Sequence, residues 1–342
     1  MNDPKGKSYV QALVRQADHG QVESIHRIFG GRNNQVFKVE TSTNKTYALK
    51  FYVSHPQDTR DRLGAEYAFC QYAWTQGLQC TPEPVAADPI NRLGLFSWVD
   101  GAVPKHVDRA SITQVLSFLE GLEGGRSEDA TVTLPMASEA CLTTIDHVET
   151  VERRLAVLIS GLDDDPLDQE VAVLLNEVSG VWKEVREKVL IAAEEIDVKH
   201  PIQRSNQCIS PSDLGFHNAL INENGKLTFL DFEYAGWDDP AKLVCDFFHQ
   251  ERIPIPKAYY VDFRDAIIGS HACPEQEAYR IDMLMPVYAV KWLTMRLNEF
   301  RPEGAHRRAF AHPDQDPMER KASQLDKARK AFQVFQSDLG NL

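Results

Sequence analysis

The segment Cys208–Ile221, CISPSDLGFHNALI, lies shortly before a second motif-rich segment, Leu227–Pro240, LTFLDFEYAGWDDP. In the first segment, Asn218 follows Asp213 by five positions. Kinase catalytic loops have this spacing, with an Asp that accepts the proton of the nucleophilic hydroxyl and an Asn that binds magnesium. The same residue types are also common in turns between strands. The pair alone therefore leaves two interpretations open, a catalytic loop or an ordinary polar turn.

A second acidic residue, Asp231, supports the catalytic interpretation. It follows the apolar run LTFL and comes 18 positions after Asp213. The segment Asn222–Gly225 between them contains an Asn-Gly pair, which is a strong hairpin signal. A hairpin of this length would return Asp231 to Asp213, where two carboxylates offer hard oxygen ligands to a cation. The alternative for Asp231 is a turn cap at the end of a strand.

A lysine and a glutamate upstream fit the same chemistry. Lys50 lies in the predicted strand 47–53, YALKFYV, in a pattern like that of the phosphate-binding lysine of kinases. Glu66 follows it by 16 positions on a predicted helix, 59–76, where it is placed to pair with Lys50 and to aim it at phosphates. The alternatives are the solvent face of an edge strand for Lys50 and a helix-surface charge for Glu66.

The connection Phe29–Phe37, FGGRNNQVF, joins two predicted strands, 25–29 and 35–40. Its backbone N–H groups could cover phosphates, although it lacks the GxGxxG pattern and a simple hairpin turn is the alternative. From this loop to Asp231, five features follow one another in kinase order: glycine loop, strand lysine, helix glutamate, Asp-Asn pair and metal-binding Asp. Their joint occurrence predicts phosphoryl transfer.

The rest of the chain indicates how the fold is divided. Another strand is predicted at 93–99, after a proline-rich break at 81–90. Beyond residue 104, most segments have apolar residues at helical spacing. We therefore predict an α+β, two-lobed fold, with a small antiparallel sheet in an N-terminal nucleotide-binding lobe, 1–100, and a larger helical lobe, 101–342, that contains the catalytic loop and the acceptor site. The predicted helices of that lobe are 111–120, 138–160, 168–196, 240–250, 256–269, 274–300 and 318–338.

Composition argues against several classes of protein. The net charge of −13 over 342 residues disfavours nucleic acid as a partner. No run of about 18 apolar residues suits a membrane helix, and the polar N-terminus lacks the apolar core of a signal peptide. Six cysteines without a CxxC pair predict neither a zinc site nor a disulfide framework. We expect a cytoplasmic protein that is a monomer or a homodimer and has no membrane partner.

With these motifs, residues 22–300 resemble the aminoglycoside phosphotransferase and choline kinase superfamily, small-molecule kinases that share the protein-kinase fold. Four blocks carry the resemblance: a strand-loop-strand signature at Gly30, Gly31, Asn34, Val36, Phe37 and Val39, an interlobe hinge at LFSWVDG, 95–101, a catalytic loop at Asp213, Leu214 and Asn218, and a metal segment from Asp231 through Gly236, Asp239 and Pro240 to Asp246.

The resemblance implies ATP and Mg²⁺ as cofactors and a small-molecule hydroxyl as acceptor. It implies that Asp213 is the catalytic residue, and that Asn218 and Asp231 bind the metal. It also implies that the Ser97 carbonyl and the Val99 N–H contact adenine, and that Asp246 supports the loop without touching substrate. The residues expected to bind the nucleotide are Gly30, Gly31, Asn34, Lys50, Glu66, Ser97 and Val99.

One departure from the superfamily concerns the catalytic loop. Its members usually have His-Gly-Asp at the catalytic aspartate, whereas this chain has Pro211-Ser212-Asp213. The missing His is normally a scaffold, so the change affects the geometry of the loop more than its chemistry. Ser212 and His217 are candidates to replace the lost hydrogen bonds.

We therefore expect an ATP-dependent phosphotransferase that acts on a hydroxyl of a sugar, an amino sugar or aminoglycoside, or an amino alcohol. Glu233, Asp238 and Asp239 could attract a cationic acceptor, or could bond to sugar hydroxyls. Because of the altered loop motif, the alternative is a pseudokinase that binds nucleotide and acts as a scaffold or regulator. A protein kinase is disfavoured, because no APE-like element follows Asp231.

Overall fold

A computed structural model of the 342-residue chain describes residues 4–18, 20–29, 33–54, 56, 58–124, 134–195, 201–311 and 313–339. Contacts within the chain group it into two compact units. The first contains Met1–Ser138 and Ile209–Trp237, and the second contains Glu139–Cys208 and Asp238–Leu342. The segment with the predicted catalytic loop therefore belongs to the same unit as the N-terminal strands. A lobe boundary at residue 100 stays a prediction.

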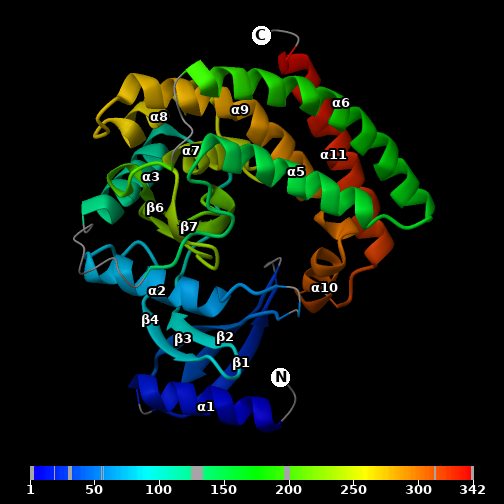
Figure 1. The fold of residues 1–342 in the computed structure, drawn as a ribbon. Coiled ribbons are helices and arrows are strands. Elements are labelled where there is room, and N and C mark those ends of the chain that lie inside the picture. The colour runs from blue at the N-terminus through cyan, green and yellow to red at the C-terminus, as the bar shows by residue number, and fades with distance from the viewer. Residues whose placement is uncertain are drawn as a thin grey trace. The chain divides into compact units, whose positions relative to one another are not determined.

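The first unit is built on a five-stranded antiparallel sheet with the strand order β1-β2-β3-β5-β4. One face packs against helix α1 (Pro4–Asp18), whose Val10, Leu13 and Val14 have the spacing of a helix face and join the sheet's core (Figure 1). The predicted antiparallel sheet is thereby confirmed. Its strands are β1 (Val22–Ile28), β2 (Gln35–Thr41), β3 (Thr46–Phe51), β4 (Pro84–Asp88) and β5 (Leu93–Ser97).

Side chains along β3 alternate between the two faces of the sheet, one facing the core and the other the candidate site. Leu49 is buried in the core cluster that α1 contributes to, so its neighbour Lys50 points to the opposite face of the sheet. Helix α2 (Arg62–Thr75) begins after Asp61, whose side chain accepts a hydrogen bond from the Gly64 N–H at 2.9 Å. The α2 helix therefore starts close to the predicted position.

Helix α1 and strand β4 were absent from the sequence prediction, as were the short strands β6 (Cys208–Ser210) and β9 (Gly236–Asp238) of this unit. Helix α1 begins in a polar stretch, so its short apolar face was overlooked. Strand β4 lies in the proline-rich segment where we expected a break, but β4 is the last strand in the sheet order and begins at Pro84. An edge strand tolerates a proline at its first residue, because one side of the strand needs no ladder partner.

The remaining elements of the first unit surround the predicted catalytic loop. Strands β7 (Ala219–Ile221) and β8 (Leu227–Phe229) form the predicted hairpin, and its turn closes through a 3.0 Å hydrogen bond from the Gly225 N–H to the Asn222 carbonyl. Helix α3 (Arg109–Gly124) and the 3₁₀ turn η2 (Phe216–Asn218) also belong to this unit. Strand β6 (Cys208–Ser210) pairs with β9 (Gly236–Asp238).

The second unit is helical, with α9 packed against α5, α6, α7, α8 and α11. Figure 1 shows the long α6 and α9 among these helices. They are α5 (Thr144–Ser160), α6 (Pro166–Glu195), α7 (Pro240–His249), α8 (Tyr260–Ile268), α9 (Pro274–Arg296), α10 (Pro302–Ala311) and α11 (Pro317–Leu339), with 3₁₀ turns η1 (Arg204–Asn206), η3 (Lys257–Tyr259) and η4 (Leu297–Phe300). The sequence prediction missed α10. Among the described helices, none has both the length and the hydrophobicity needed to cross a membrane.

Candidate active site

Lys50 is held between two carboxylates that follow it in the chain, Glu66 on α2 and Asp231 much further downstream. Its Nζ lies 2.6 Å from Glu66 Oε1 and 2.8 Å from Asp231 Oδ1. The Tyr52 hydroxyl donates to the other Glu66 oxygen at 2.7 Å, which fixes the glutamate. Burial opposes the charge on Lys50, but Asp231 and Glu66 outweigh it and raise its pKa above the ordinary value. The structure therefore unites three residues that the sequence predicted would act together.

Asp231 has an unusual backbone. Its φ is +70°, in the left-handed region, which costs energy for a residue with a side chain. The next residue, Phe232, is buried and stacks on Phe69 of α2 with ring centroids 4.5 Å apart. This packing holds the segment in place while the Asp231 side chain keeps 32% of its surface exposed.

The Asp213–Asn218 pair forms a local hydrogen-bonded loop. Asn218 Nδ2 donates to the Asp213 carbonyl at 3.0 Å and to Asp213 Oδ2 at 3.1 Å. The Leu230 N–H donates to the Asn218 carbonyl at 2.7 Å, which ties this loop to the chain just before Asp231. The Asp213 side chain is 33% exposed, and its Oδ1 accepts no hydrogen bond from Asn218.

The unusual Pro-Ser-Asp sequence is stabilised by a residue that the sequence analysis did not select. The Ser210 hydroxyl accepts a hydrogen bond from the Ser212 N–H at 3.0 Å, and the Asp213 N–H donates to the Pro211 carbonyl at 2.9 Å. Ser212 takes a φ of +65°, so the loop turns sharply there. A serine hydroxyl can accept a hydrogen bond from the N–H two residues further on, which favours a turn. This sequence signal could have identified Ser210.

His217, the other candidate for supporting the loop, contributes less. Its Nε2 lies 3.6 Å from Asp213 Oδ1, beyond hydrogen-bond distance. Its buried Nδ1 has no hydrogen-bond partner among the described residues. Hydrogen bonds that involve Ser210, Asn218 and the main chain therefore support the loop.

The structure describes some of the predicted nucleotide-binding residues but not all of them. Gly30 and Gly31 lie outside the described residues. Asn34 is buried, donates to Glu233 Oε2 at 2.6 Å and accepts from the Val53 N–H at 3.3 Å, so its side chain anchors the β1–β2 connection. Ser97 ends β5, where its N–H donates to the Glu83 carbonyl at 2.9 Å. Adenine contacts at Ser97 and Val99 stay predictions.

The donor atoms near Asp231 suit magnesium better than a transition metal. Asp231 offers a carboxylate and Asn218 an amide oxygen, and both are hard oxygen ligands. Within the described part of the chain, no group of three or more His, Cys, Asp or Glu residues is placed to hold a metal ion. Magnesium usually takes one or two protein ligands and completes its shell with substrate phosphates and water, so these residues fit it.

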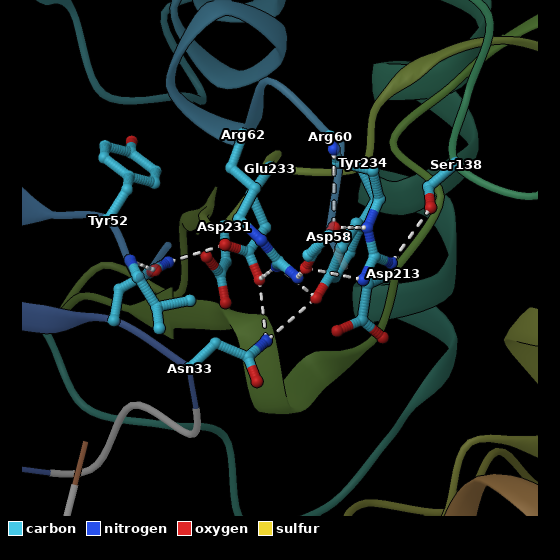
Figure 2. A network of polar contacts seen from close by, with 12 residues as sticks. Asn33, Tyr52, Asp58, Arg60, Arg62, Ser138, Asp213, Asp231, Glu233 and Tyr234 are labelled. Carbon is cyan, nitrogen blue, oxygen red and sulfur yellow. Dashed lines mark hydrogen bonds and ion pairs between the residues drawn. The ribbon is translucent and has the colours of Figure 1, made fainter. Parts of the chain in front are cut away.

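A second polar network, absent from the sequence analysis as a site, is centred on Glu233 (Figure 2). Glu233 Oε1 lies 2.8 Å from Arg62 Nη1 and accepts from Asn33 at 2.7 Å. Arg62 Nη2 lies 2.6 Å from Asp58 Oδ2. The only signal available in the sequence was a pair of opposite charges, Arg62 and Glu66, one turn apart on a largely apolar helix.

The acidic residues considered for acceptor binding have other partners. Glu233 is 2% exposed and occupied as described, and in the second unit Asp238 and Asp239 are fully buried. Asp238 pairs with Lys242 at 2.7 Å, and Asp239 with Arg280 at 2.6 Å. The expectation that they attract an acceptor is not supported by this geometry. Asp246, implied as a support for the loop, binds Lys291 at 2.9 Å, and its effect on the loop stays a prediction.

Comparisons with known proteins identify the family and the fold of the chain. The sequence matches the phosphotransferase enzyme family over residues 24–242. An ethanolamine kinase from Plasmodium vivax is similar in structure, with 15% identity and a TM-score of 0.57 over 96% of this chain and 89% of that one. A macrolide 2′-phosphotransferase from Brachybacterium faecium aligns with 14% identity and a TM-score of 0.52 over 92% of this chain and 100% of that one. A spectinomycin phosphotransferase in complex with ADP and spectinomycin aligns with 10% identity and a TM-score of 0.55 over 95% and 98%.

Because their sequence identities to the chain are low, these structures show its fold alone. The α+β, protein-kinase-like fold predicted from the sequence is confirmed, and the class of protein is a small-molecule phosphotransferase. The chain belongs to the phosphotransferase enzyme family. No curated protein sequence is similar enough to the chain to match it.

Proposed function

We propose that the protein transfers the γ-phosphoryl group of ATP to a hydroxyl of a small molecule. The observation that carries this proposal is the Lys50 ammonium held by Glu66 and Asp231, in the same compact unit as the Asp213–Asn218 loop. Phosphoryl transfer depends mainly on positioned positive charge and an oriented nucleophile. Lys50 would supply the positive charge, and Asp213 would orient the nucleophile.

Each residue has a role that its geometry supports. Asp213, hydrogen-bonded through one oxygen to Asn218, has its other oxygen available to orient the acceptor hydroxyl and to accept its proton. Lys50 would contact phosphate oxygens while Glu66 keeps its ammonium in place. Asn218 and Asp231 would hold Mg²⁺, which supplies charge neutralisation at the phosphates when it is bound.

The acceptor class is the finer part of the proposal. We propose a hydroxyl of an amino alcohol, a sugar or an amino sugar, which is the range suggested by the ethanolamine kinase and the antibiotic phosphotransferases of similar fold. Glu233, Asp238 and Asp239 give no reason to prefer a cationic acceptor, because each is buried and paired. The expected cytoplasmic location and monomeric or homodimeric state remain predictions.

The proposal is tested by acceptor-stimulated ADP release from purified protein with ATP and Mg²⁺. The panel should contain choline-like alcohols, neutral sugars, amino sugars and hydroxy amino acids. We expect one class to stimulate release far above the rate without acceptor. A protein that binds nucleotide but releases no ADP with any acceptor would instead fit the pseudokinase alternative suggested by the altered Pro211-Ser212 sequence.

A further inference from the structure

Two oppositely charged residues on one face of α2 connect the helix to the metal segment, one directly and one through Lys50. Arg62 and Glu66 are four positions apart, which places them on the same side of the helix, and both are buried. Glu66 reaches Asp231 through Lys50, whereas Arg62 Nη1 binds Glu233 Oε1 directly at 2.8 Å. Asp231 and Glu233 are two positions apart on a single segment. The segment is thus attached to α2 at two points.

Glu233 also connects this segment to the end of the β1–β2 connection. Its Oε1 accepts from Asn33 Nδ2 at 2.7 Å, and its Oε2 accepts from Asn34 Nδ2 at 2.6 Å. Figure 2 shows Asn33 and Arg62 directed at Glu233 from separate elements. With only 2% of its surface exposed, Glu233 is a buried carboxylate whose charge is balanced by Arg62 and whose oxygens also accept hydrogen bonds from two amides.

Arg62 is itself held in a fixed orientation. Its Nη2 lies 2.6 Å from Asp58 Oδ2, and its Nη1 donates to the Tyr234 hydroxyl at 2.5 Å. Burial opposes ionisation of Asp58, but Arg60 and Arg62 outweigh it and keep the pKa of Asp58 well below the ordinary value. These contacts hold the Arg62 guanidinium in the orientation in which it binds Glu233, so the pair is preorganised.

The orientation of Asp231 depends on how this segment is anchored. Its φ of +70° is unfavourable in isolation and persists only if the neighbouring residues hold the backbone. Phe232 packs against Phe69 on one side, and Glu233 is fixed by Arg62, Asn33 and Asn34 on the other. Loss of the Glu233 contacts would release the segment immediately after the predicted metal ligand.

We propose that Glu233 is a positioning residue that orients the Asp231 carboxylate for the metal-nucleotide complex by binding Arg62 of α2 and the two asparagines. The inference rests on the proposed kinase function. Groups that orient metal ligands typically change metal affinity by about 10- to 100-fold when they are replaced. Glu233 would affect the metal only through Asp231. Its replacement should therefore change metal binding as well as turnover.

The test is Mn²⁺ binding to the full-length protein in the presence of a non-hydrolysable ATP analogue, measured by electron paramagnetic resonance, with thermal unfolding as the readout for folding. We expect Glu233→Gln to weaken Mn²⁺ binding about 10-fold or more. Glu299→Gln is the matched control, because Glu299 is a buried glutamate of the second unit, 3.1 Å from Arg308 and 3.4 Å from Arg320. It should leave Mn²⁺ binding unchanged.

A double-mutant cycle with Arg62 gives the second readout. Arg62→Lys keeps the charge but loses the planar contact to both Glu233 and Asp58. If the two residues act as one unit, the combined variant weakens Mn²⁺ binding less than the product of the two single effects. Arg62→Lys alone also tests the proposal if Glu233→Gln does not fold, because it should then weaken Mn²⁺ binding by itself.

The outcomes separate this inference from the proposed function. If the wild-type protein binds Mn²⁺ and nucleotide but Glu233→Gln or Arg62→Lys binds Mn²⁺ with wild-type affinity, the positioning role is wrong while the kinase function stands. Multiplicative effects in the cycle would equally overturn it. If the wild-type protein binds no metal-nucleotide complex, the proposed function itself fails.

Discussion

At the scale of single residues, exposure distinguishes groups that face a ligand from groups that hold them. Asp213 and Asp231 each keep about a third of the side chain exposed, 33% and 32%, whereas Glu66 is 2% exposed. A buried glutamate that contacts Lys50 and Tyr52 has no surface left for substrate. In the proposed function, the chemistry therefore falls on the two aspartates and the lysine, with Glu66 in support.

Replacing the proposed proton acceptor should separate chemistry from binding. Asp213→Asn keeps the shape of the side chain and an oxygen for Asn218, but it loses the basic carboxylate. We expect turnover to fall by about 100- to 10,000-fold, with nucleotide affinity unchanged. Single-turnover kinetics and calorimetric nucleotide binding measure the two effects. Wild-type turnover with the true acceptor would refute the assignment.

Ser210 allows a test of the unusual loop sequence. Ser210→Ala removes the acceptor for the Ser212 N–H and should lower the free energy of unfolding by about 1 to 3 kcal/mol, with a reduced kcat because Asp213 is less well fixed. Ser210→Thr keeps the hydroxyl and is the matched control. Denaturant unfolding and steady-state kinetics provide the measurements. If Ser210→Ala behaves like Ser210→Thr in both, the hydroxyl has no part in supporting the loop.

At the scale of elements, one carboxylate connects three helices of the second unit. Asp239 accepts from the Ala241 N–H at 2.7 Å and so caps α7, while Arg280 of α9 donates to it at 2.6 and 2.8 Å. His147 of α5 lies 3.1 Å from the same carboxylate through Nε2, and its Nδ1 lies 2.8 Å from the Tyr288 hydroxyl. The start of α7 is thereby fixed to α5 and α9.

This junction should make stability depend on pH. Burial opposes the charge on His147, but Cys141 and Asp239 outweigh it and raise its pKa from 6.5 to about 9. A raised folded-state pKa stabilises the protein fully below about pH 6.5, and that contribution disappears as the pH rises through 9. The shift corresponds to about 3 kcal/mol at most.

The measurement is the free energy of unfolding of the wild type and His147→Gln between pH 6 and 9.5. The difference between the two proteins should be largest at the acid end and should shrink with rising pH. A difference that is constant, or that grows with pH, would mean that His147 is not preferentially protonated in the folded state.

At the scale of the whole molecule, the residues of the proposed chemistry belong to one compact unit formed by two separate stretches of sequence. A ligand that binds only the folded protein stabilises it by about 2.7 kcal/mol at 100 times its Kd. We therefore expect a non-hydrolysable ATP analogue with Mg²⁺ to raise the Tm by several degrees. Lys50→Met should abolish most of this shift, and an equal shift in both proteins would place the nucleotide elsewhere.

The sequence predicted the parts of the site that have a fixed spacing along the chain. Asp213 with Asn218, Lys50 in its strand and Asp231 after the Asn-Gly hairpin all have short-range signals. The structure joins Lys50 to Glu66 as expected and adds a contact between Lys50 and Asp231. The contact of Asn33 with Glu233 spans 200 positions, and that of Arg62 with Glu233 spans 171. No local pattern records such a pairing, so Glu233 was interpreted as an acceptor ligand.

The missed elements have a similar cause. Helix α1 depends on three apolar residues that face the sheet, and β4 depends on its place at the sheet's edge, where Pro84 is tolerated. Both are decided by tertiary context more than by local propensity. The helices of the second unit have long apolar periods and were largely predictable, apart from α10.

Arg62 and Glu66 lie one turn apart on α2, so their contacts with Glu233 and Lys50 both depend on the position of this helix. A shift of the helix by one residue rotates each side chain by about 100° and moves it by about 1.5 Å. Arg62 and Glu66 would then leave Glu233 and Lys50 together, since both sit on the same rigid turn. Both contacts therefore depend on the same register of α2, and we expect a change that displaces the helix to disturb the Lys50 and Glu233 contacts together.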